Sequence, residues 1–94
     1  VWGSTGPNSF GCSGFTQWVY RQNGIYIPRT SSEQKAAAKK VVSLSELEVG
    51  DILWRSGHVG IYIGNGRYVH APHTGDVVKV SSGVGKFTCG LRYQ

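Results

Sequence analysis

An Asn-Gly pair stands between two alternating segments in the second half of the chain, and it constrains the fold more than any other feature of the sequence. Residues 58–63 read His-Val-Gly-Ile-Tyr-Ile, and residues 67–71 read Arg-Tyr-Val-His-Ala. Alternation of apolar and polar side chains with a period of two is typical of a half-buried β-strand, and Asn-Gly is a strong signal of a tight turn between antiparallel strands. We therefore predict a β-hairpin over residues 58–71.

The remaining segments predict helices first and strands afterwards. Residues 12–23 carry apolar side chains at i, i+3 and i+4 and are followed by Gly24, which predicts a first helix. Thr30 and Glu33 have the spacing of a capping box, which predicts a short second helix ending near Lys40. This order predicts an α+β domain, with N-terminal helices packed on one face of a roughly five-stranded antiparallel sheet. The further strands are expected at 51–55, 77–81 and 86–93.

Length and charge narrow the class of protein. Ninety-four residues with a net charge of +5 fit a single basic domain. The cations are scattered, which is typical of a solvated surface, and no nucleic-acid motif accompanies them. No apolar run is long enough to span a bilayer. Because the chain begins with Val and has no signal segment, we expect residues 1–94 to be one domain, a mature form or a piece excised from a longer chain, whose targeting sequence, if any, has been removed. We also expect it to act as a monomer.

Cys12 is the first candidate for chemistry. It stands at the start of the predicted first helix, where unpaired N–H groups and a partial positive charge favour the nucleophilic thiolate. Gly11 and Gly14 add little bulk around it, and the backbone N–H groups of Cys12 and Ser13 could hold a developing oxyanion. The alternative is a small buried cysteine near a helix end, which is common. We expect Cys89, in the last predicted strand, to be a packed thiol, and Cys12 to remain free.

The histidines of the hairpin are the second candidates. A two-residue turn would pair Ile61 with His70 and place His73 opposite His58. A three-residue loop whose last glycine is left-handed would instead pair Gly60 with His70, so that His58 and His70 become diagonal neighbours on one face. Strand alternation alone leaves His70 and His73 both open as partners of His58. The cysteine and the histidines lack the close pair typical of structural zinc sites, so we expect no metal.

Taken in order, these segments resemble the NlpC-type family of cell-wall endopeptidases, papain-like cysteine peptidases that cut peptidoglycan stem peptides. The matching segments run nearly from end to end of the chain. They are Trp2-Gly3, Cys12-Ser13-Gly14-Phe15, Pro28-Arg29-Thr30-Ser31 with Gln34, Gly50-Asp51-Ile52, the segment from His58 to Gly64, and His70-Ala71-Pro72 with Gly75.

The resemblance implies a role for each of the candidate residues. Cys12 is the expected nucleophile, His58 its base, and His70 the group that orients the imidazole of His58, which favours the three-residue turn. No metal or organic cofactor is expected. Residues that the resemblance places in the substrate groove are Trp2, Ser13, Arg29 and Ser56.

The resemblance also implies a substrate and a location. The expected reaction is hydrolysis of a stem-peptide amide, typically the bond from D-γ-glutamyl to the diamino acid, outside the cytoplasm (secreted, in the cell wall or in the periplasm). Gly11 stands where the family has an Asp that helps to bind the free amine of the substrate. Alternative interpretations are a wall-binding relative without catalysis, an amidase or acyltransferase on the same framework, and nucleic-acid binding through the positive charge.

Overall fold

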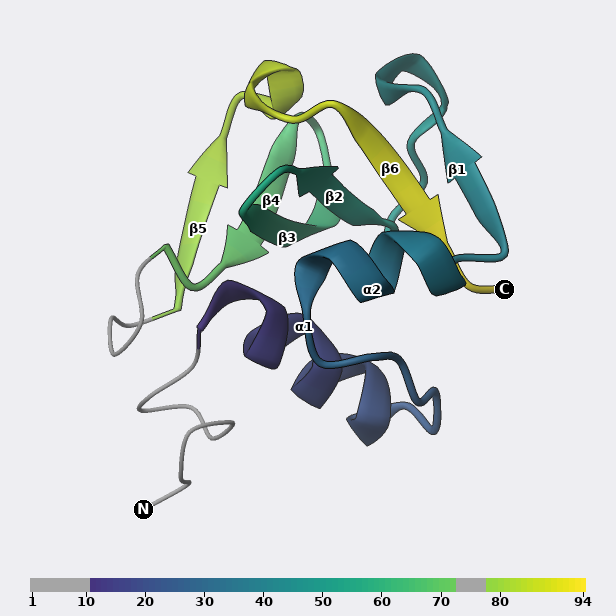
Figure 1. The fold of residues 1–94 in the computed structure, drawn as a ribbon. Coiled ribbons are helices and arrows are strands. Elements are labelled where there is room, and N and C mark those ends of the chain that lie inside the picture. The colour runs from purple at the N-terminus through teal and green to yellow at the C-terminus, as the bar shows by residue number, and fades with distance from the viewer. Residues whose placement is uncertain (1–10, 73–77) are drawn as a thin grey trace.

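The computed structural model describes residues 11–72 and 78–94. Within these residues, two helices precede an antiparallel sheet of six strands in the order β1-β6-β2-β3-β4-β5 (Figure 1). The helices are α1 (Cys12–Gln22) and α2 (Ser31–Ala37), and two short 3-10 helices are η2 (Leu44–Glu46) and η3 (Val84–Lys86). The strands are β1 (Lys40–Val42), β2 (Ile52–Arg55), β3 (His58–Gly64), β4 (Arg67–His70), β5 (Lys79–Ser82) and β6 (Cys89–Arg92). No helix in this part of the chain is long and apolar enough to cross a membrane.

The α+β class is confirmed, and the sheet has one strand more than we expected. The second predicted helix does not continue to Lys40, because the backbone becomes extended at Ala38, with φ −62° and ψ 138°. The next residues form β1, which pairs with β6 and buries Val42 to 2% exposure. Burial of this β-branched side chain against the sheet outweighs the helix propensity of the preceding alanines.

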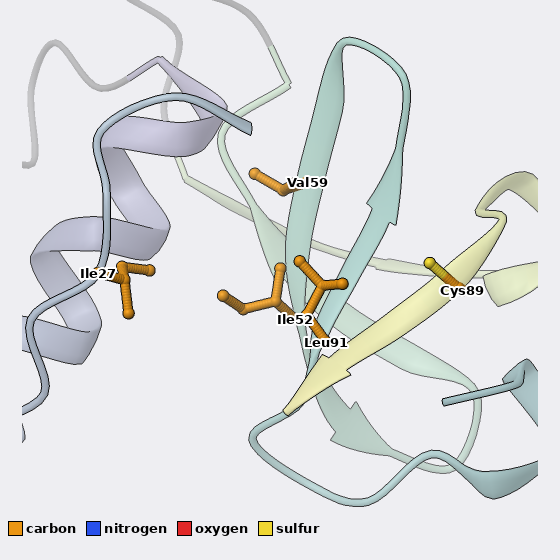
Figure 2. Close-up of a cluster of buried hydrophobic side chains, with 5 residues drawn as sticks. All are labelled: Ile27, Ile52, Val59, Cys89 and Leu91. Atoms are coloured by element: carbon orange, nitrogen blue, oxygen red, sulfur yellow. The ribbon is translucent and has the colours of Figure 1, made fainter. Parts of the chain in front are cut away.

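The two helices cover one face of the sheet. Beneath them lies a cluster of buried side chains in which β2, β3 and β6 meet the loop that follows α1, and Figure 2 shows this cluster. A neighbouring cluster seats α1 on the hairpin, where Phe15 packs with Ile61 and Ala71. Burial of these side chains supplies the main stabilisation of the helix layer. The residues of Figure 2 are Ile27, Ile52, Val59, Cys89 and Leu91.

The opposite face of the sheet has its own smaller core. Leu53, Tyr68 and Phe87 are buried there, with side chains from the segments around η2 and η3 packed against them. Leu53 and Tyr68 alternate along their strands with residues that face the helices, such as Ile52 and Val69. Both faces of the sheet are therefore covered, one by the two helices and the other by the segments around η2 and η3. On this second face polar side chains lie next to the apolar core.

The hairpin between β3 and β4 combines the two turns that the sequence left open. Asn65 and Gly66 have φ values of 56° and 73° and form a two-residue turn, with Gly64 paired to Arg67. A bulge between Tyr62 and Gly64 then shifts the register by one residue. As a result Gly60 lies against His70, as expected for the longer loop: a Cβ atom on Gly60 would be 3.2 Å from the Cβ of His70.

An ion pair between the partly exposed Arg92 and the buried Asp51 ties the last strand to the loop before β2. The guanidinium of Arg92 donates to both carboxylate oxygens of Asp51, from Nε at 2.9 Å and from Nη2 at 2.7 Å. Asp51 is 4% exposed and also accepts from the backbone N–H of Glu48. Hydrogen bonding to Asp51 raises the pKa of Arg92, so the guanidinium stays charged. The pair is a bidentate contact, which is the favourable geometry between an arginine and a carboxylate.

Two tyrosine hydroxyls form hydrogen bonds between the helix layer and the rest of the fold. Tyr20 of α1 donates to the carbonyl of Gly50, and Tyr93 donates to the carbonyl of Gln34. Burial raises the pKa of Tyr20 from 10.0 to about 12, with further contributions from Asp51 and Tyr93. Burial also raises the pKa of Tyr93 to about 12.

These tyrosines predict a loss of stability at alkaline pH. Since their pKa values are higher in the folded than in the unfolded chain, their stabilisation is complete below about pH 10 and is lost as the pH rises toward about 12. We expect Tyr20→Phe to reduce the free energy of unfolding by about 1 kcal/mol at neutral pH and to make its alkaline fall less steep. Urea unfolding across this pH range measures both effects. Tyr26→Phe, at an 81% exposed position, is the control, and an unchanged alkaline slope in Tyr20→Phe would contradict the prediction.

The close approach at Gly60 predicts that a single methyl group there is harmful. In Gly60→Ala the new Cβ would lie 3.1 Å from Cδ2 of Tyr68 and 3.3 Å from the carbonyl oxygen of Val69, so these neighbours must move by a few tenths of an ångström. We expect a loss of about 1–3 kcal/mol in the free energy of unfolding, as for other overpacked cores. Gly85→Ala, where no atom lies within 4 Å, should change it by less than about 0.5 kcal/mol. Equal effects of the two substitutions would refute this account of the hairpin.

Candidate active site

The first residue of α1 and the two hairpin histidines lie near one end of the sheet, around the start of β3. His58 begins β3 and His70 ends β4, so the antiparallel pairing of these strands brings them to the same end. Cys12 approaches this end from the helix-covered side. Its thiol lies 3.9 Å from the carbonyl oxygen of Gly57, the residue immediately before His58. Three candidates that are far apart in the sequence are thus gathered around the start of β3.

The two histidines are joined directly. Nε2 of His58 lies 2.8 Å from Nδ1 of His70, and the two rings are inclined at 79°. One of these nitrogens must donate its proton and the other must accept it. His70 is only 8% exposed, whereas His58 is partly exposed, so the hydrogen bond is partly shielded from water. His70 is therefore the hairpin residue bonded to His58, whereas the competing candidate, His73, lies outside the described residues.

Apolar groups on the second face of the sheet hold both imidazoles. The ring of Phe87 stacks on His58 at a centroid distance of 5.9 Å and an angle of 16°. Tyr68, almost fully buried, contacts the ring of His70 at 4.7 Å. Gly60 leaves room between the strands for the side chain of His70. Each imidazole of the pair therefore packs against an aromatic side chain.

The start of α1 is positioned by the amide of Gln34 rather than by a helix cap. Gly11 occupies the N-cap position and offers no capping side chain. Gln34 reaches from α2 and donates to the carbonyls of Ser13, at 3.0 Å, and Pro28, at 2.9 Å. Its oxygen accepts from the hydroxyl of Thr16 at 2.9 Å. The first turn of α1, and with it Cys12, is therefore fixed by side-chain hydrogen bonds from the second helix.

The residues that the resemblance placed in the substrate groove have different surroundings. Ser13 and Arg29 contact each other, with Nη1 of Arg29 2.9 Å from the hydroxyl of Ser13, and the guanidinium lies against Gly14. Ser56 is exposed in the turn between β2 and β3. Trp2 lies outside the described residues. Contact of these four with substrate stays a prediction, and for Ser13 and Arg29 the structure adds a bracing role at the start of α1.

A pocket of about 190 Å³ opens beside the histidine pair and carries two cations that we did not predict. Arg55, at the end of β2, and Lys86, in η3, line it together with the two histidines. The sequence offered little signal for them, because its cations are scattered and only the sheet brings these two together. None of the lining residues is acidic, so the pocket is suited to a negatively charged ligand. The other lining residues are Tyr68, Pro72 and Phe87.

Ser81 is a further site residue that sequence reasoning missed. Its hydroxyl lies 2.9 Å from Nε2 of His70, so that His70 contacts His58 through one ring nitrogen and Ser81 through the other. In the register of β4 and β5, Ser81 is paired with Tyr68, and His70 is paired with Lys79. The contact is thus diagonal across the two strands. Recognising it requires this register, for which the sequence between the strands holds no signal.

Cys12 is free, as we expected, and Cys89 is free as well. Cys89 is buried in the cluster beneath the helices, and this burial raises the pKa of its thiol, partly offset by Lys35. Cys12 is half-buried at the edge of the same cluster. Among the residues described, no group of three or more His, Cys, Asp or Glu side chains has the arrangement of a metal site.

Comparison with known proteins identifies the family to which the chain is similar. The model of the NlpC/P60 family matches residues 1–89. A probable endopeptidase of Corynebacterium glutamicum is 55% identical over 73 residues, which cover 74% of this chain and 34% of that protein. The bifunctional muramidase/DL-endopeptidase CwlT of Bacillus subtilis is 41% identical over 84 residues, which cover 80% of this chain and 25% of that protein.

A solved structure extends the likeness to the whole fold. The crystal structure of the NlpC/p60 domain of the peptidoglycan hydrolase SagA has a TM-score of 0.79 and 40% identity, covering 97% of this chain and 83% of that one. The chain spans about a third and a quarter of the length of the two curated relatives. From the family match and from this agreement of sequence and fold, we conclude that the chain belongs to the NlpC/P60 family.

Proposed function

We propose that this domain is a thiol-dependent peptidoglycan endopeptidase. The observation that carries the proposal is the 2.8 Å contact between His58 and His70 at the point where Cys12 meets the start of β3. A nucleophile, a base and a group that orients the base are the parts that covalent catalysis by a thiol requires. Family membership and the endopeptidase and peptidoglycan hydrolase names of the relatives support the same assignment.

The roles in the reaction follow from which ring nitrogens are engaged. Since Nε2 of His58 contacts His70, Nδ1 is the nitrogen that accepts the proton of the Cys12 thiol. The thiolate then attacks the carbonyl carbon of a stem-peptide amide, and the oxyanion is held by backbone N–H groups at the start of α1. The imidazolium of His58 returns its proton to the leaving amine. Water, deprotonated by the same imidazole, hydrolyses the thioester and releases Cys12.

The pocket beside the histidines supports a substrate with a carboxylate close to the cleaved bond. Arg55 and Lys86 offer positive charge there without an acidic neighbour in the pocket wall. The bond from D-γ-glutamyl to the diamino acid has this character, because a γ-linked glutamyl residue retains its α-carboxylate. The DL-endopeptidase activity in the name of CwlT is consistent with that bond. Peptidoglycan is extracytoplasmic, so we propose that the domain acts outside the cytoplasm, as a monomer.

Gly11 bears on which end of the stem peptide is recognised. The residue before the nucleophile carries no carboxylate in this chain, so it cannot pair with a free amine of the substrate. We infer that the domain cleaves stem peptides without requiring a free N-terminal alanine. Recognition then depends on the cations of the pocket, Arg55 and Lys86, and on the carboxylate of the substrate that they would bind.

Loss of the nucleophile tests the proposed reaction. We expect the wild-type domain to cleave purified muropeptides at the D-γ-glutamyl bond, and Cys12→Ala to lower the rate by at least about 1,000-fold, because no other thiol lies at the site. Mass spectrometry of the products identifies the bond.

The matched control is Cys89→Ala, which removes the other thiol away from the histidines. It should retain cleavage, although the buried position will lower stability somewhat. Iodoacetamide at neutral pH should alkylate Cys12 faster than Cys89, since burial raises the pKa of Cys89. Binding to cell walls without cleavage, together with a slowly alkylated Cys12, would contradict the proposal and indicate a wall-binding relative.

A further inference from the structure

We propose that Ser81 is a positioning residue that sets the direction of the hydrogen bonds running from His58 through His70. The inference rests on the proposed function, since it concerns the same thiol and base. It goes beyond that function by assigning a role to a residue on β5, a strand that carries none of the expected site residues. The contact that carries it is the 2.9 Å distance between the hydroxyl of Ser81 and Nε2 of His70.

The chain of contacts can run in two directions, and these differ in chemistry. If Ser81 accepts from Nε2 of His70, then Nδ1 of His70 carries a lone pair and accepts from Nε2 of His58. The second ring nitrogen of His58, Nδ1, is then the basic one. If Ser81 donates to Nε2 of His70 instead, His70 carries its proton on Nδ1 and donates it to Nε2 of His58. His58 then carries its own proton on Nδ1. In that direction His58 holds a proton on the nitrogen that must accept one from Cys12.

The charged form of the site allows only the first direction. After proton transfer His58 is an imidazolium with protons on both nitrogens, so its Nε2 must donate. His70, when neutral, must then accept through Nδ1 and carry its proton on Nε2, where Ser81 accepts it. A hydroxyl can accept this bond and a methyl group cannot. Ser81 therefore stabilises the state in which Cys12 is a thiolate and His58 an imidazolium.

The other groups facing the histidines are unchanged by a substitution at Ser81. Arg55 and Lys86 line the pocket beside them, Lys79 is the cross-strand neighbour of His70, Tyr68 packs on its ring and Cys12 stands at the start of α1. The positive charges of Arg55, Lys86 and Lys79 disfavour the imidazolium form of His58. A hydrogen bond that favours the imidazolium should therefore have a measurable effect on its stability. Because these groups are the same in wild type and variant, a difference between the two proteins measures the effect of losing the Ser81 hydroxyl.

The test compares Ser81→Ala with Ser81→Thr, which keeps the hydroxyl and suits a strand. We expect Ser81→Ala to lower kcat/KM on muropeptides about 3- to 10-fold, the usual effect of losing one hydrogen bond. The alkaline limb of its pH profile should move to lower pH, because the imidazolium is less stable. Ser81→Thr should restore both quantities toward wild type. Ser82→Ala, an exposed serine of the same strand, is the matched control and should change neither.

Two further measurements separate this inference from the proposed function. The rate of Cys12 alkylation by iodoacetamide against pH reports the thiolate and imidazolium pair whatever the substrate, and the ¹⁵N spectrum of the imidazoles reports the tautomer of His70. If wild type cuts no muropeptide but Ser81→Ala still shifts the alkylation profile, the substrate assignment fails and the role of Ser81 stands. An unshifted profile in Ser81→Ala, or a loss that Ser81→Thr does not restore, overturns the role, as does a His70 protonated on Nδ1.

Discussion

The buried amide of Gln34 is the interaction on which the arrangement of this domain depends. It is fully inaccessible, and its oxygen and nitrogen together contact Thr16, Ser13 and Pro28. An amide in this position would be costly if any partner were lost, because a buried polar group must be hydrogen-bonded. Satisfied as it is, it links both helices and the loop between them into one layer.

α1 packs on the hairpin through Phe15, and α2 adds polar contacts between the helix layer and the sheet. The indole Nε1 of Trp54, on β2, donates to the carbonyl of Ser31 at 2.8 Å, and the ammonium of Lys35 lies 4.2 Å from the indole centroid. The thiol and the imidazoles come from opposite faces of the sheet and meet only at its end. Their relative position therefore depends on how the helix layer is seated, not on any contact within the hairpin. The polar contacts of α2 therefore help to set the position of the thiol relative to the imidazoles.

Sequence patterns predicted the parts of this fold that local physics determines. The alternation in β3, the Asn-Gly turn and the capping pair at Thr30 each appear where the pattern indicated, and the thiol and His58 lie at the ends of their predicted elements. The register that sets Gly60 against His70 was expected for the longer loop, but the bulge that produces it lies between Tyr62 and Gly64, where no residue type signals it, and not within a three-residue loop. The additional edge strand was missed because its stability comes from the distant β6.

The pocket residues show where such reasoning ends. Arg55, Lys86 and Ser81 come from three separate elements, and each is unremarkable in its own segment. They become site residues only through the order and register of the strands. Sequence motifs marked Ser13 and Arg29 more strongly, yet these two contact each other and brace the helix start. A motif can thus record a structural requirement of the site as readily as a contact with substrate.

The bulge in the hairpin has a consequence for how such domains can vary. A change of one residue in the connection between β3 and β4 would bring Val69 or Ala71 to the position that His70 now occupies, while the strands could still pair. Length variation here is therefore constrained by its parity: an added residue must be matched by the loss of the bulge, or by a second added residue. Relatives with connections of different length should show this compensation, and a hairpin that lacks it can remain folded while its chemistry is lost.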